Sequence, residues 1–149
     1  MNTAQTIIAA GFDLGNLDNP DFNQVTHKVA VIEDADGEPV SGFYIVGKNS
    51  AEYQEANNVV RHDNIKRASK RSKHIDSSTD EGAQVVANTV DRNEKAIAIA
   101  ITVGWFGFNA GGQPREFDKA LVAKMFDKFP VWQAKVINDL EKDSNFMKV

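Results

Sequence analysis

The sequence has no cysteine and only three histidines in 149 residues. Without thiols, a disulfide framework, a cysteine nucleophile and a thiolate metal site are all excluded. The HExxH, GxSxG, GxGxxG and Walker motifs are also absent, so we expect a protein that is not an enzyme and uses no cofactor or metal. Gly111-Gly112 lacks the lysine of a phosphate loop, and Asp34, Asp36 and Glu38 lack the rest of a calcium loop. Both patterns are interpreted as turns.

Long hydrophobic runs are missing as well. No apolar run approaches the ~18 residues that a membrane span requires. The beginning of the sequence lacks the basic region and the apolar core of a secretory signal. The sequence therefore predicts a cytoplasmic protein with no membrane partner.

Positive charge is concentrated in one segment of a chain whose formal net charge is −4. Residues 61–74 have a formal charge of +5, because the single acid Asp63 faces six basic side chains: Arg61, Lys66, Arg67, Lys70, Arg71 and Lys73. Such a segment indicates a solvated helix face, a surface for an acidic protein partner or a phosphate-binding surface. It lacks the aromatic residues that stack on bases in single-strand binders, so nucleic acid is the least favoured partner.

The first half of the chain predicts a hairpin and a helix. Residues 1–24 show no sustained periodicity and are predicted to be a flexible lead-in. Alternating apolar residues, turn chemistry and a second β-prone run predict a β-hairpin over 25–47. Asn49 and Glu52 have the spacing of a capping box, so a helix is predicted over about 50–72.

The most apolar stretch, AIAIAITV at residues 96–103, fits two structures. Its alternating isoleucines indicate a strand. Upstream, Ser78 and Glu81 have capping-box spacing, and the apolar residues that follow them fit a helical period. We therefore predict a helix over about 79–103 that ends with Gly104 as its C′ residue. A strand remains the open alternative for this stretch.

Two shorter helices are predicted near the end of the chain. Asp118 is a suitable N-cap for a helix over about 118–127, and Pro130 suits the first turn of a helix over about 130–143. Together the elements predict an α+β fold, mainly α. It consists of a single domain over 25–149, with an N-terminal β-hairpin followed by about four helices.

Several short motifs follow one another in a characteristic order. They are Gly37, Pro39 and Gly42 in the hairpin, Gly47-Lys48-Asn49-Ser50 before the first helix, then Val103-Gly104-Trp105, Gly111-Gly112, Phe117-Asp118, Pro130-Val131-Trp132 and Asn145-Phe146. In this order the chain resembles the tail assembly chaperones of long-tailed, siphovirus-like bacteriophages over roughly residues 25–147. The stretch at 104–109 departs from the family pattern, because it is richer in aromatic residues and glycine.

The resemblance implies a non-catalytic assembly factor of the host cytoplasm that is absent from the mature virion. Such a protein binds and solubilises the helical tape-measure protein, helps to recruit tail-tube subunits and self-associates along its client. A longer frameshifted product often shares its N-terminal region. The alternative function, from the residues alone, is a small nucleic-acid-binding regulatory protein that uses the basic segment 61–74.

Two groups of side chains are candidates for binding the client. The basic residues of 61–74 are predicted to attract acidic client segments. The aromatic candidates for apolar contact are Trp105, Phe106, Phe108, Trp132 and Phe146. Packing in the core is the alternative interpretation of the aromatic residues, because large rings at such positions are commonly buried.

Overall fold

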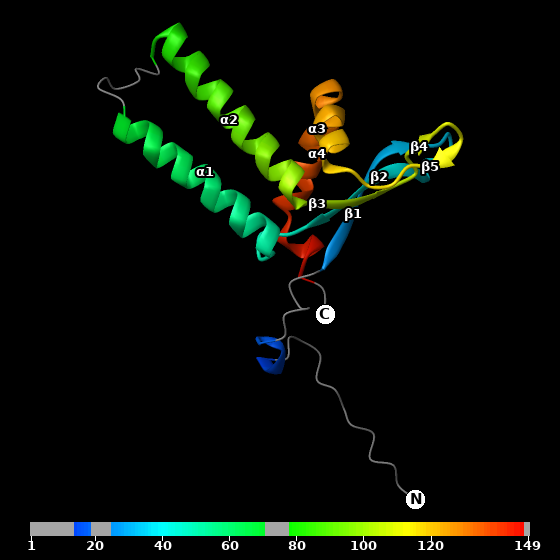
Figure 1. Cartoon of the computed structure of the whole chain (residues 1–149). Helices are drawn as coiled ribbons and strands as arrows, with labels where there is room; N and C mark the ends of the chain where they lie inside the picture. Colours follow the sequence, from blue (N-terminus) through cyan, green and yellow to red (C-terminus); the bar gives the residue numbers. More distant parts are fainter. Residues whose placement is uncertain (1–13, 19–24, 71–77, 148–149) are drawn as a thin grey trace, which may run out of the picture.

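The computed structural model describes residues 14–18, 25–70 and 78–147. Within these ranges a three-stranded sheet and four α-helices form an α+β fold that is mainly helical (Figure 1), so the predicted fold class is confirmed. Most of the predicted lead-in lies outside the described residues, and its described part holds the short 3-10 helix η1 (Leu14–Asn16). None of the helices in these ranges combines the length and apolar character that a membrane span requires.

Strands β1 (Thr26–Glu33) and β2 (Pro39–Val46) form the predicted antiparallel hairpin. In the turn between them, the Asp34 carboxylate accepts hydrogen bonds from two backbone N–H groups at 2.9 and 3.0 Å. Gly37 has a φ of +80°, a conformation that glycine adopts without strain. The acidic pattern of this segment therefore builds a turn, as predicted.

A third strand, β3 (Thr102–Phe106), directly follows helix α2 (Asp80–Ile101) and pairs antiparallel with β2. The predicted helix over 79–103 is therefore wrong at residues 102 and 103. The prediction that Gly104 caps this helix is also wrong, because it lies within β3 and the positive φ of +73° occurs later, at Gly107. Pairing with the free edge of β2 determines this structure, and the local sequence contains no sign of that partner.

The remaining elements lie close to the predicted ranges. Helix α4 ends earlier than predicted, and residues that follow it form a 3-10 turn. The elements are α1 (Ala51–Lys70), the short paired strands β4 (Asn109–Ala110) and β5 (Gln113–Pro114), α3 (Lys119–Lys128), α4 (Pro130–Leu140) and η3 (Asp143–Asn145). The last residues of the first predicted helix, 71 and 72, lie outside the described residues.

Side chains satisfy backbone N–H groups at the first turns of three helices. Asp118 caps α3 as predicted, accepting a hydrogen bond of 2.9 Å. At α2 the N-cap is Thr79, one residue after the predicted Ser78, and its hydroxyl accepts a hydrogen bond of 3.0 Å. At α1 the Ser50 hydroxyl, not Asn49, accepts a hydrogen bond of 3.2 Å from the first turn. Each cap fixes where its helix begins.

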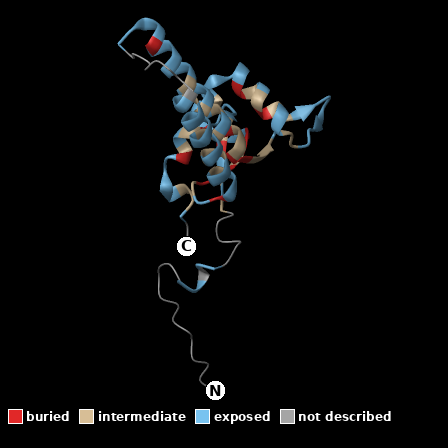
Figure 2. Ribbon diagram, turned by 60° about the vertical axis from the view of Figure 1, so that its left-hand side comes forward, coloured by how far each residue is buried: buried red, intermediate tan, exposed pale blue. Residues whose placement is uncertain are grey.

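The hydrophobic core lies on one face of the sheet, which α3, α4 and the end of α2 cover. Figure 2 shows the buried residues gathered in this region. The core consists of Val29, Phe43, Ile45, Val46, Ala98, Ile101, Val122, Phe126, Val136 and Leu140. We call the sheet, residues 96–101, α3 and α4 the body.

Helix α1 and the first part of α2, residues 80–95, form a pair that extends away from the body (Figure 1). We call this pair the arm. Most of its residues are exposed, as the pale blue colour of Figure 2 shows. The body and the arm therefore differ sharply in how much apolar surface they bury.

Candidate binding surfaces

Three of the five predicted aromatic residues lie together in the body, around Phe43 of β2. The ring centroids of Phe108 and Trp132 lie 5.3 and 6.2 Å from that of Phe43, and the Trp105 ring lies 5.6 Å from Phe108. All three are half-buried and pack against the core. The geometry favours core packing for this group, which is the alternative that the sequence left open.

Local structure directs these rings to the core face. Trp105 lies opposite Phe43 in the β2–β3 pairing, and residues opposite each other in antiparallel strands share a face. Its indole Nε1 donates a hydrogen bond of 2.8 Å to the Arg115 carbonyl, so its polar atom is satisfied. Trp132 lies in the first turn of α4 and stacks on Phe129 at 4.2 Å. These contacts hold the rings in place.

Phe106 lies on the other face of the sheet, because successive strand residues point to opposite faces. Its ring lies 5.5 Å from that of Tyr44, and the Lys28 ammonium lies 4.3 Å from the ring centroid. A side chain at Gly42 would collide with this ring, so the glycine makes room for it. Phe106 is therefore separated from the other predicted aromatic residues by the sheet.

Phe146 packs at a third place, near the start of the sheet. Its ring meets His27 edge-on at 5.8 Å, and it occupies the space that a side chain at Gly47 would need. His27 Nε2 in turn lies 3.1 Å from Asp139 Oδ2. The end of the described chain is thus attached to the body, and the five predicted aromatic residues do not form one surface.

The arm carries exposed apolar side chains on the stripe of α2. Val85, Val86 and Val90 on α2 are 41–48% exposed, although they belong to the apolar stripe of that helix. Across from them, the apolar stripe of α1 ends at Val60. The next residues on that side of α1 are polar, Asn64 and Arg67. The valines stay partly exposed beside these polar residues, and a hollow lies between the two helices there.

Two hollows lie between α1 and α2, one where the arm meets the body and one within the arm. The hollow near the body has a volume of about 340 Å³ and is lined by Glu52, Glu55, Ala56, Val59, Val60, Ala96, Ala100 and Lys119. The other, which we call the tip hollow, has a volume of about 280 Å³ and is lined by Asn64, Arg67, Ala68, Val85, Val86, Thr89, Val90 and Asn93. Each contains small or branched apolar side chains of both helices.

The predicted basic residues lie along α1 as far as the structure describes them. Arg61 and Lys66 are exposed, whereas Arg67 is half-buried and lines the tip hollow. None of these three forms an ion pair with any residue in the described ranges. Lys70 is the last residue of α1, and Arg71 and Lys73 lie outside the described residues.

Several charged groups form ion pairs at the surface of the body. Lys48 Nζ donates a hydrogen bond of 2.6 Å to Glu141 Oε2, which raises the pKa of Lys48 above its ordinary value. Lys95 pairs with Asp127 between α2 and α3. Within the described ranges no cluster of three or more histidine or acidic side chains could hold a metal ion. The first pair connects the segment before α1 with the residue after α4, and the second connects α2 with α3.

The exposed valines were not recognised as a surface from the sequence. The helical period of the predicted helix over 79–103 includes these valines and gives no sign that they are exposed. A signal was present, however, because the apolar stripe of the preceding helix fades beyond Arg61 while that of the next helix continues. Two adjacent helices with stripes of unequal length leave part of the longer one uncovered.

Comparison with known proteins finds no family model that matches the chain, and no curated protein or solved structure that is significantly similar to it.

Proposed function

We propose that this protein is a non-catalytic tail assembly chaperone of a long-tailed bacteriophage. It binds and solubilises the tape-measure protein in the host cytoplasm, helps to recruit tail-tube subunits and self-associates along the client. The order of the sequence motifs supports this proposal. The structural observation that carries it is the arm. Its α2 valines are partly exposed, and hollows lie between α1 and α2.

The physical argument concerns what a long helical client requires. Its apolar stripe has no partner until the tail tube surrounds it, so a chaperone must cover the stripe and later release it. Helical clients lie in apolar grooves through residues spaced by three and four positions. Weak contacts repeated over many copies hold such a client reversibly. The arm offers a groove of this kind, whereas the aromatic cluster around Phe43 is already occupied by its own packing.

Co-expression with the tape-measure protein of the same genome tests the proposal. We expect wild-type protein to keep the client in the soluble fraction and to co-purify with it. The double substitution Val86→Asp with Val90→Asp places two charges in the tip hollow, and we expect it to reduce the co-purified client several-fold. Circular dichroism of the variant alone checks that the fold is retained.

The matched control is Val131→Asp, because Val131 is 66% exposed on α4 of the body, far along the chain from the arm. It introduces the same kind of charge on exposed apolar surface and should leave the complex unchanged. A client that stays insoluble with wild-type protein would contradict the proposed function. Equal losses for the arm and control variants would remove the arm as the client surface.

A second candidate is a nucleic-acid-binding regulatory protein. The observation in its favour is that Arg61 and Lys66 are exposed and form no ion pair within the described part of the chain. Binding through such residues would be released by moderate salt. Retention of the wild-type protein on DNA at low salt, lost in a variant with Arg61→Gln and Lys66→Gln, would favour this function over the first.

A further inference from the structure

The tip hollow combines valines of α2 with a charged side chain of α1. The α2 wall presents Val86 and Val90, which are four residues apart and therefore lie one above the other on the same side of the helix. The α1 wall presents Arg67, whose side chain is only half-exposed. Its methylene stem can cover apolar surface, but its guanidinium has no carboxylate among the described residues.

Arg67 is half-buried and forms no ion pair within the described part of the chain, so its charge affects which partners the tip hollow can bind. A partially desolvated charge is stabilised most by an opposite charge that forms hydrogen bonds to it, and arginine pairs with carboxylates in a fixed, often two-pronged geometry. A partner that brings only apolar side chains would bury the guanidinium further and leave it unpaired, which weakens binding. The hollow therefore discriminates by charge as well as by apolar contact.

We infer that the tip hollow binds an amphipathic helix whose aliphatic stripe packs on the α2 valines and whose flank carries a carboxylate that pairs with Arg67. The partner lies along the arm as a third helix, so that its ridge of side chains enters the space between α1 and α2. The two walls also fix how the helix is rotated about its own axis, because its acidic flank must face α1. This inference depends on the proposed function only for the identity of the natural client.

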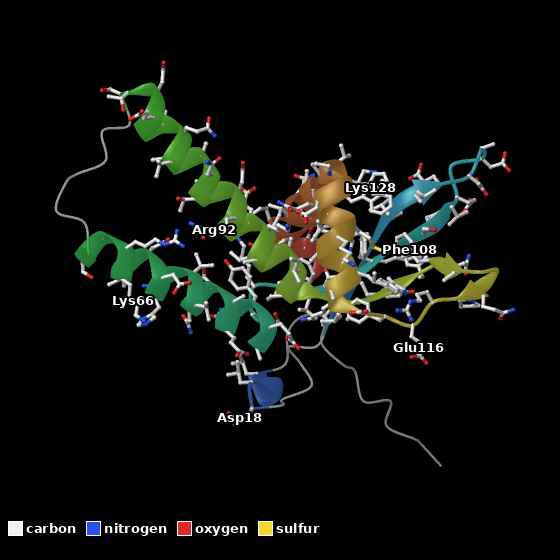
Figure 3. All side chains as sticks on the ribbon, turned by 45° about the horizontal axis from the view of Figure 1, so that its top comes forward. Asp18, Lys66, Arg92, Phe108, Glu116 and Lys128 are labelled. Carbon is white, nitrogen blue, oxygen red and sulfur yellow. The ribbon has the colours of Figure 1, made fainter. Side chains whose placement is uncertain are left out.

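Neighbouring residues of α1 provide an internal control for this geometry. Lys66 precedes Arg67 and carries the same charge, but it is exposed and lies on the side of α1 away from α2 (Figure 3). It does not line the tip hollow. A contribution from general electrostatic attraction would involve both residues equally, whereas the pairing that we infer involves Arg67 alone.

Fluorescence anisotropy with two designed helical peptides tests the inference on the full-length protein. Both peptides have the same leucine and valine stripe, and the flanking residues are glutamate in one and lysine in the other. We expect the wild-type protein to bind the glutamate peptide roughly tenfold or more tightly than the lysine peptide at low salt. Arg67→Glu should reverse this preference, whereas Lys66→Glu should preserve it. Circular dichroism confirms that each variant is folded.

The possible results separate this inference from the proposed function. If Arg67→Glu and Lys66→Glu change peptide binding equally, or neither peptide binds, the inference is wrong, whatever happens to the tape-measure protein. If peptide preference reverses with Arg67→Glu but the tape-measure protein is not solubilised, the groove is supported and the chaperone function fails. Sedimentation velocity tests whether a second copy of the chain occupies the tip hollow. A wild-type dimer that dissociates in the Val86→Asp variant would show that it does, and would overturn the inference.

Discussion

The body and the arm contain similar helices but bury very different amounts of apolar surface. In the body, Phe43, Phe126 and Val136 are almost wholly buried. In the arm, the valines of α2 remain more than two-fifths exposed although they follow the same helical period. The difference lies in the facing element: the body helices face the sheet and one another, whereas the arm stripe faces Asn64 and Arg67. A helix is buried only where its neighbour carries a matching stripe.

The largest effect should come from removing the ring at the centre of the body. Phe43→Ala should lower the free energy of unfolding by about 3–5 kcal/mol, because it leaves a cavity among Phe108, Phe126 and Trp132. Val86→Ala in the arm should cost less than about 1 kcal/mol, since its side chain is 43% exposed. Urea unfolding followed by tryptophan fluorescence and circular dichroism measures both. Similar costs would mean that the arm is packed like the body.

Two glycines of the body sharpen the comparison at the level of the backbone. Gly107 has a φ of +73°, and a Cβ there would lie 1.7 Å from the Val40 carbonyl oxygen. Gly107→Ala should therefore cost about 2–3 kcal/mol or more. At Gly104 the nearest atom to a Cβ would be Cδ2 of Tyr44, at 3.4 Å.

Gly104→Ala is the control for the Gly107 substitution, and it should change stability by less than about 1 kcal/mol because alanine is favoured over glycine within a strand. Thermal unfolding of the two variants in parallel measures the difference. A larger loss at Gly104 than at Gly107 would contradict the assignment of residues 102–106 to a strand.

Substitutions on the two faces of the sheet should differ less in their cost to the free energy of unfolding than the substitutions above. Phe108 packs on Phe43 and Trp105, whereas Phe106 contacts Tyr44 and Lys28 on the outer face. Phe108→Ser should cost about 2–3 kcal/mol and Phe106→Ser about 1 kcal/mol. Chemical denaturation gives both values. If Phe106→Ser is the more damaging, the outer face is buried in solution by another surface.

The smallest change in the free energy of unfolding is expected from a substitution at Lys48, where the arm joins the body. Lys48 precedes α1 and donates a hydrogen bond to Glu141, which raises the pKa of Lys48 above its ordinary value. A raised pKa stabilises the folded state fully below the pKa of the unfolded chain, about 10.4, and this stabilisation is lost as the pH rises through the folded value. Because the pair is exposed, Lys48→Met should cost only a few tenths of a kcal/mol at neutral pH.

The pH dependence distinguishes this pair from a general effect of charge. The stability difference between wild type and Lys48→Met should shrink as the pH is raised above about 10.4. Lys124→Met, which removes an exposed lysine of α3 with no ion pair among the described residues, should show no such trend. Urea midpoints across this pH range provide the measurement, and parallel trends for the two variants would contradict a role for Glu141.

Features that depend on neighbouring residues were predictable from the sequence. The acids before Gly37 form a turn, Asp118 caps α3, and Pro130 begins α4, because each uses backbone groups within a few residues. A strand was only the alternative prediction for 96–103, and the bounds Thr102–Phe106 were not predicted, since the partner β2 lies beyond the whole of α1 and α2 in the chain. The alternating isoleucines before this strand, up to Ile101, also fit a helix, and they lie in α2.

The candidate surfaces were harder to predict for the same reason. Trp105 and Phe106 are adjacent in sequence but lie on opposite faces of the sheet, which only the strand assignment reveals. The exposure of the arm valines depends on which residues of α1 lie opposite them. Arg67 lines the tip hollow because α2 lies beside that face of α1. Such properties come from the pairing of distant segments.

Helix α2 passes into β3 at Thr102 without a connecting loop, and this has a mechanical consequence. Residues 80–95 of α2 extend about 24 Å from the body, so a sideways load at the tip reaches the sheet through the packed residues 96–101. Rotation about Thr102 would peel β3 from β2 one hydrogen bond at a time, because β3 is at the edge of the sheet. A load along the axis of β3 would instead shear all of these bonds together. The resistance of the junction therefore depends on the direction in which a bound partner pulls.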